Sequence, residues 1–190
     1  MYALGHLGIA LLAFAPLALF LRNRRRNHVA AAGTLTTACF ATLPDIDQWL
    51  ATVPHRGVTH TVWFGVALGV VLASGAAVYG RRSATVAVTS AGWAMLVGTL
   101  TTIAHLTGDV VTPMGISPLA PVVEGHVTLN LVAAANPAAN QTLFTLGMLA
   151  TVASWWAGTE REQTVPTRRT IRRAVGRVDS GTDHGRRDSP

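Results

Sequence analysis

The sequence predicts an all-α fold, a polytopic membrane helix bundle of about five transmembrane helices. Only 13% of the 190 residues are charged, whereas a soluble domain normally carries about a quarter. The hydrophobic residues make up 49% of the chain and are gathered in long runs. Because a helix needs about 20 apolar residues to cross a bilayer, these runs are long enough to span a membrane.

Five apolar segments follow one another, and they cover residues 3–21, 29–44, 58–79, 84–108 and 129–157. The first resembles a signal peptide in length, but its basic cluster follows it instead of preceding it, so we expect a retained helix. The second is short and ends at Pro44. The last contains Pro137, which leaves two possibilities open: a helix that starts near Thr142, or an earlier start with a break at the proline.

The distribution of arginine predicts how the chain crosses the membrane. All fifteen basic residues are arginines, and all but one lie after the first, third and last segments. With five spans these three regions share one side, which the positive-inside rule makes cytoplasmic. We therefore expect a multi-pass protein of the cell (plasma) membrane, with the N-terminus outside and the C-terminus in the cytoplasm.

Two regions differ in composition. Residues 1–158 form the expected transmembrane domain, whereas residues 159–190 are polar and rich in arginine. Such a tail cannot bury a core, and we expect it to be disordered or to lie on the anionic inner leaflet. A topology determinant explains its charge better than nucleic-acid binding does, so no nucleic acid is expected as a partner.

Histidine and acidic residues gather on the side opposite the arginines. They are His6, Asp45, Asp47, His55, His60, His105, Asp109, Glu124 and His126. Ionisable groups within membrane spans are costly and usually functional. The sequence therefore predicts a polar site at the extracytoplasmic face.

His105 and Asp109 are four residues apart, so a helix places them on one face, one turn apart. This arrangement suits two ligands of one metal, although an incidental histidine followed by a capping aspartate has the same spacing. Asp45 and Asp47 alternate in a turn after Pro44. Both can reach one cation, or one can orient a histidine ligand; alternatively, one of them caps a short helix.

His55 and His60 are five residues apart and cannot both face one metal from a regular helix. His60, at the start of the third segment, is the better ligand, and His55 belongs to the loop. Arg56 is the single arginine on this side, and it can bind a phosphate, a carboxylate or a lipid headgroup. His6 is either a further ligand or a core residue with its own partners.

Imidazole and carboxylate ligands suit a divalent metal ion, most of all zinc. Such an ion can lower the pKa of a bound water, and a carboxylate can take the proton. The sequence contains no G-x-S-x-G, Walker A, H-E-x-x-H or C-x-x-C motif, so these better-known chemistries are not indicated.

The blocks GHLGIA, LPDIDQ, HRGVTHT and HLTGDVVTPMGISPLAP, in this order, resemble the YdjM-like family of LexA-binding, inner membrane-associated proteins predicted to be metal-dependent hydrolases. The resemblance covers roughly residues 2–121. It implies roles for His6, Asp45, Asp47, His55, Arg56, Gly57, His60, His105, Asp109, Thr112, Pro113 and Gly115. Family members commonly have a histidine where this chain has Gln48, and glutamine is a poor metal ligand.

Together these features predict a membrane-embedded metal-dependent hydrolase that acts on an ester or phosphoester, for example that of a lipid, near the extracytoplasmic face. The expected metal ligands are His6, Asp45, Asp47, His55, His60, His105 and Asp109. The expected catalytic residues are Asp45, Asp47 and Arg56. The alternative is a non-catalytic metal-binding or transport protein. A transporter often shows an internal repeat and polar residues near mid-membrane, and neither is evident here.

Overall fold

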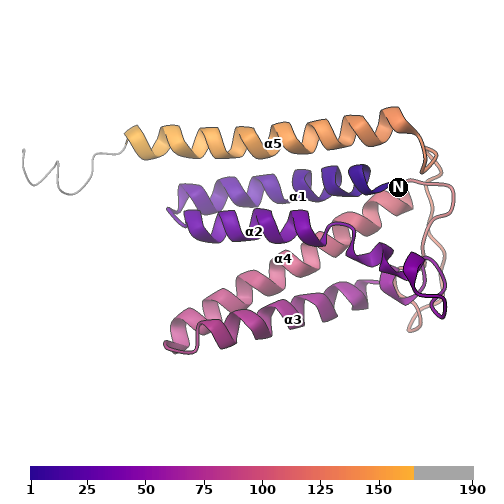
Figure 1. Ribbon diagram of the computed structural model, residues 1–190, viewed down its shortest axis with the longest axis horizontal. Helices are drawn as coiled ribbons and strands as arrows, with labels where there is room; N and C mark the ends of the chain where they lie inside the picture. The colour runs from indigo at the N-terminus through magenta and orange to yellow at the C-terminus, as the bar shows by residue number, and fades with distance from the viewer. Residues whose placement is uncertain (165–190) are drawn as a thin grey trace, which may run out of the picture.

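A computed structural model describes residues 1–164 and shows a helical bundle (Figure 1). The helices are α1 (Ala3–Asn23), α2 (Asn27–Phe40), α3 (Val62–Tyr79), α4 (Ala84–Val110) and α5 (Pro137–Thr164), and two 3₁₀ helices, η1 (Leu43–Trp49) and η2 (Val58–His60), separate α2 from α3. No strand occurs in this part of the chain, which has one isolated bridge, between Ile116 and Val127. The all-α prediction is confirmed.

Four segments are long and apolar enough to cross a membrane: α1, α2 together with η1, α3 and α4. The chain is therefore a multi-pass membrane protein. Helix α5 is as long as α4 and lies alongside α1 over its length (Figure 1). Helix α5 contains more polar residues than α4. In the part of the chain that the structure describes, it does not meet the criteria of length and apolar composition for a membrane span.

The main departures from the expected spans lie in the last third of the chain. Helix α5 begins at Pro137 itself, without a break, because the first turn of a helix is where proline is tolerated. The preceding residues belong to a loop, in which the amides of Leu129 and Leu131 donate to the carbonyls of Val110 and Val111. Neither of the two possibilities for the last span was therefore right: the helix starts before Thr142, and it has no break at Pro137. Helix α5 also continues to Thr164, into the expected tail; the rest of that tail lies outside the described residues.

Helix α1 holds the bundle together, because it contacts α2, α4 and α5, while α3 packs against α4. Phe14, Ala18 and Leu21 of α1 form a core cluster with Ala30 of α2 and Val97 of α4. Apolar burial drives helix association weakly in lipid, so close backbone packing has to contribute.

Glycines allow that close packing at two helix pairs. A Cβ atom on Gly147 of α5 would collide with the backbone of Gly8 in α1, and one on Gly8 would collide with the backbone of Leu143. In the same way Gly98 of α4 faces the backbone of Gly69 in α3. Any larger residue at these positions would push the helices apart.

The bundle has two chemically different ends (Figure 1). The start of α1, both 3₁₀ helices and the loop 111–136 lie at one end, which we call the loop end. The turns between α1 and α2 and between α3 and α4 lie at the other, which we call the arginine end because it carries Arg24, Arg25, Arg26, Arg81 and Arg82.

We predict that Gly147→Leu weakens the packing of α5 on α1 and lowers the free energy of unfolding by about 1–3 kcal/mol, the usual cost of overpacking. Thermal unfolding in detergent, followed by circular dichroism, measures the change. Gly75→Leu in α3 is the matched control, because nothing lies within 4 Å of a Cβ atom placed there. Equal melting temperatures for the two variants would contradict the close α1–α5 contact.

Candidate metal centre

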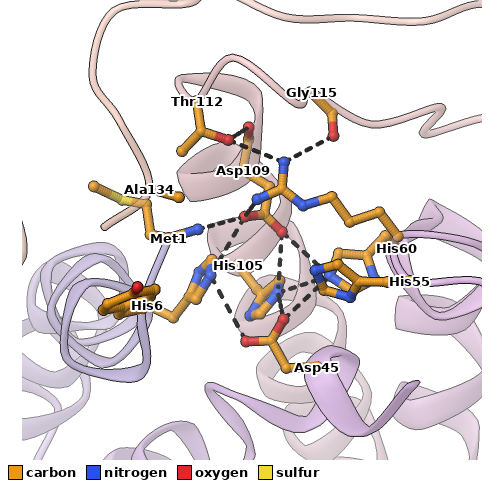
Figure 2. Close-up of polar contacts among 12 residues, drawn as sticks. Met1, His6, Asp45, His55, His60, His105, Asp109, Thr112, Gly115 and Ala134 are labelled. Atoms are coloured by element: carbon orange, nitrogen blue, oxygen red, sulfur yellow. Dashed lines mark hydrogen bonds and ion pairs between the residues drawn. The ribbon is translucent and has the colours of Figure 1, made fainter. Parts of the chain in front are cut away.

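Five side chains from four elements converge at the loop end (Figure 2). They are His6 of α1, Asp45 of η1, His60 of η2, and His105 and Asp109 of α4. The three histidines and Asp109 are at most 1% exposed, whereas the side chain of Asp45 is 16% exposed. The cluster is therefore buried, and Asp45 is its most exposed member.

His105 and Asp109 point into the cluster from successive turns of α4, and His105 Nε2 lies 3.3 Å from Asp109 Oδ2. The other ring nitrogen of His105, Nδ1, lies 2.8 Å from the backbone carbonyl oxygen of Ala41. A carbonyl oxygen can only accept a hydrogen bond, so Nδ1 carries the hydrogen. In the neutral ring the lone pair of Nε2 therefore faces the cluster.

Asp47 orients His60 in a similar way. Its Oδ2 lies 3.1 Å from His60 Nδ1 and accepts hydrogen bonds from the Thr59 hydroxyl and the Arg56 amide, both at 2.8 Å. Its Oδ1 lies 2.9 Å from His55 Nδ1. Both oxygens of Asp47 are thus occupied, and His60 directs Nε2 into the cluster. A carboxylate behind a histidine is the usual outer support of a metal ligand.

The converging donor atoms have the spacing of a metal coordination shell. The Nε2 atoms of His60 and His105 lie 3.2 Å apart, and both are 3.2–3.3 Å from Asp109 Oδ2. Ligands held tetrahedrally at about 2.0–2.1 Å from an ion are about 3.3–3.4 Å from one another. Asp45 Oδ1 lies slightly farther, 3.5 Å from His60 Nε2 and 3.7 Å from His105 Nε2. Two imidazole lone pairs this close repel each other, so either a proton or a metal ion has to lie between these two nitrogens.

Unpartnered polar atoms also indicate a cation. Among the described residues both ring nitrogens of His6 and Oδ2 of Asp109 are buried without a hydrogen bond, and each such atom costs about 1–3 kcal/mol. The His6 ring stacks on His105 with centroids 3.6 Å apart. Its Nε2 lies 3.4 Å from Asp109 Oδ1 and 3.8 Å from Asp45 Oδ2. These residues could hold a divalent metal ion.

Arg56 lies against the cluster and binds Asp109 directly. Its Nη2 donates to Asp109 Oδ1 at 2.6 Å, and the amino group of Met1 contacts the same oxygen at 2.6 Å. Its Nη1 donates to the Thr112 hydroxyl at 2.9 Å and to the Gly115 carbonyl at 3.0 Å. Asp109 therefore presents Oδ1 to these two cations and to His6, and Oδ2 to His60 and His105. Both terminal nitrogens of the Arg56 guanidinium therefore donate hydrogen bonds within the protein.

The charge distribution favours a positive charge at His60. Burial alone lowers the pKa of His60, but the carboxylates of Asp109, Asp45 and Asp47 outweigh it and raise the pKa to about 9. A position that attracts a proton this strongly also attracts a metal ion, which would replace that proton.

The structure brings five of the seven expected ligands together and places two outside them. Asp47 and His55 form a neighbouring group with Asp45, and the hydrogen bonds of Asp47 show that it positions His60. Sequence reasoning from spacing missed Thr59, whose place directly before His60 was a usable signal. It also missed the carbonyl of Ala41, for which no side chain gives a signal.

The fold and the site define a multi-pass helical membrane protein with a buried His/Asp group that could hold a metal. The chain belongs to the YdjM inner membrane protein family, whose model matches residues 1–167. A search of curated proteins found no match, and neither did a search of solved structures.

We predict that the purified protein retains a stoichiometric divalent metal, and that His105→Ala combined with Asp109→Ala reduces the metal content to background because two converging donors are lost. Asp47→Asn should keep the site but weaken affinity about 10–100-fold, the usual effect of losing an outer-shell partner. Elemental analysis after desalting, with a competing chelator for affinity, gives both values.

The matched control is His28→Ala combined with Glu124→Ala, because this pair also removes one histidine and one carboxylate, but outside the cluster. Circular dichroism should show the same helix content in all variants. A wild-type protein without metal after incubation with divalent ions would contradict a metal centre.

Proposed function

We propose that this protein is a membrane-embedded, zinc-dependent hydrolase that acts on an ester or phosphoester. One observation carries the proposal: the three shortest donor separations join His60, His105 and Asp109, at 3.2, 3.2 and 3.3 Å. Catalytic zinc sites commonly have three nitrogen or oxygen ligands and one open position, whereas structural sites more often contain thiolates. The donor set here contains no thiolate.

Asp45 is the residue we propose as the general base. It lies next to the three proposed ligands and has the most exposed side chain of the five, so it borders the open side of the site. A bound zinc ion would supply an activated water and polarise the ester oxygen. The Asp45 carboxylate would accept the proton from that water. Asp47 is less suited to this role, because both of its oxygens already accept hydrogen bonds.

Arg56 has two roles in this proposal: it holds the proposed ligand Asp109 in position, and its positive charge stabilises an anionic substrate. Its contact with Asp109 Oδ1 leaves Oδ2 free for the ion. Its side chain is 8% exposed, and its Nε is buried without a hydrogen bond among the described residues. The positive charge lies close enough to the cluster to stabilise an anionic substrate such as a phosphoester. Because the side chain is buried, Arg56 is less suited to contact the headgroup of a surrounding lipid that does not enter the site.

The proposed site lies at the extracytoplasmic face, with the N-terminus outside and the C-terminus in the cytoplasm. The positive-inside rule supports this orientation, because the loop end lies opposite the arginine end. Membrane lipid is the proposed substrate source. Trp49, Val58, Met114 and Val122, from the segments that surround the site, are 60% exposed or more, as in proteins that contact the membrane interface.

A non-catalytic metal-binding protein is the second candidate. His6, His60 and His105 are fully buried, and a closed shell of protein ligands is typical of structural metal sites. The two candidates differ in one measurable property, which is turnover by the metal-loaded protein.

We predict that a cysteine at Gly125, in the 111–136 loop, reacts with a membrane-impermeant maleimide in intact cells, and that a cysteine at Ser83 reacts only after lysis. Both positions are exposed, so access depends on the side of the membrane. The native Cys39 is first replaced by serine in both variants. The reverse labelling pattern would overturn the proposed orientation.

We predict metal-dependent hydrolysis of carboxylate esters or phosphodiesters, including phospholipids in mixed micelles, by the zinc-loaded protein. Asp45→Asn should keep bound zinc yet lower kcat by about 10²–10⁴-fold, the usual contribution of a general base. Release of acid or alcohol, followed by mass spectrometry, measures turnover.

Glu124→Gln is the matched control, because it makes the same carboxylate-to-amide change in an exposed loop residue outside the cluster. It should turn over at the wild-type rate. Stoichiometric zinc without hydrolysis of any substrate would rule out the enzyme and support the non-catalytic candidate. Equal activity of Asp45→Asn and the wild type would instead remove Asp45 from the mechanism.

A further inference from the structure

A second feature of the fold lies towards the arginine end. A cavity of about 560 Å³ opens between α2, α3 and α4. Its walls are Ala32 and Thr36 of α2 and Leu72 and Ala76 of α3, and Trp93 of α4 lies in its floor. Most of the lining is aliphatic or threonine, so the cavity suits a hydrocarbon chain.

The cavity exists because two helices diverge. Helices α2 and α3 both pack on α4, and they separate from each other towards the arginine end (Figure 1). The floor along α4 extends from Thr85 near that end to Val97. Val97 lies about two helical turns before His105, so the cavity is separate from the metal cluster.

The entrance of this cavity, which has the form of an apolar groove between α2 and α3, is positively charged. Arg26 and His28 both line it and are both exposed. Tyr79, which is 92% exposed, lies at the same end, where an interfacial aromatic residue is expected. The groove thus combines an apolar interior with a basic entrance, and its complement is an amphiphile with a long apolar tail and an anionic head.

We propose that this groove binds one acyl chain of an anionic phospholipid from the leaflet at the arginine end, with the lipid phosphate at Arg26 and His28. Basic residues next to a membrane span attract anionic lipids, and here the charge lies at the entrance of a preformed apolar groove. The proposal does not depend on the hydrolase activity, because it uses other residues at the other end of the bundle.

The charge at the entrance and the size of the interior together suit a lipid chain. The groove offers about 560 Å³, a volume within the range of small-ligand pockets.

Quenching of Trp93 by brominated lipid tests the proposal in the full-length protein. The protein is placed in phosphatidylcholine vesicles that contain increasing amounts of phosphatidylglycerol with a brominated acyl chain. The difference in quenching between the protein and Trp93→Phe isolates the signal of the groove. We expect half-maximal quenching at a mole fraction at least about fivefold lower than with brominated phosphatidylcholine, which corresponds to one arginine contact.

Two variants and one control make the test specific. Arg26→Gln should raise the half-maximal mole fraction of phosphatidylglycerol about fivefold, and Ala76→Phe should reduce the maximal quenching with either lipid because it fills the groove. Arg81→Gln removes the same charge at the same end of the bundle but outside the groove lining, and it should behave like the wild type.

Several outcomes would overturn the proposal. Equal quenching by both headgroups would mean that ordinary surrounding lipid reaches Trp93. Equal effects of Arg81→Gln and Arg26→Gln would mean general attraction to the basic surface. No quenching by either lipid, with Trp93 emission that changes with protein density, would mean that a second copy covers the groove. If Ala76→Phe fails to fold, the comparison of Arg26→Gln with Arg81→Gln still tests whether the lipid headgroup binds at the entrance of the groove.

Discussion

The buried carboxylate of Asp109 is the interaction on which the loop end depends. Its Oδ1 contacts Arg56, the Met1 amino group and His6, and its Oδ2 contacts His60 and His105. An ionised carboxylate is costly in an apolar interior unless positive charge surrounds it. The start of α1, the end of α4 and the segment that carries both 3₁₀ helices are therefore held together by charge at this point.

The rest of the bundle is stabilised differently. Between the two ends glycines let the helices pack closely, as where Gly8 of α1 faces Leu143 and Gly147 of α5. Such contacts suit a lipid environment, where apolar surface gains little from burial and close packing decides. A bundle that is rigid along its length and irregular at one end can hold ligands from four elements in fixed positions.

The sequence predicted the residues of the cluster better than their roles. Two observations were enough to predict that the cluster residues lie at the same end of the bundle. They are the four-residue spacing of His105 and Asp109 and the side of the membrane assigned to each loop. Spacing could not show that the Asp47 carboxylate accepts hydrogen bonds from His55, Thr59 and the Arg56 amide. These hydrogen bonds depend on how the loop after η1 folds. The backbone carbonyl that fixes the ring of His105 carries no side-chain signal at all. The start of α5 was ambiguous for a similar reason. The apolar composition of the preceding loop is typical of a membrane span, and only its hydrogen bonds to the end of α4 show that it is a loop.

The order of the elements has a consequence for biosynthesis. All five converging side chains belong to the first 109 residues, whereas α5 begins at Pro137 and packs mainly on α1. All the side chains that could hold a metal ion are therefore synthesised before α5. Helix α5 is the last of these helices to join the bundle, and the group that could bind the ion does not need it.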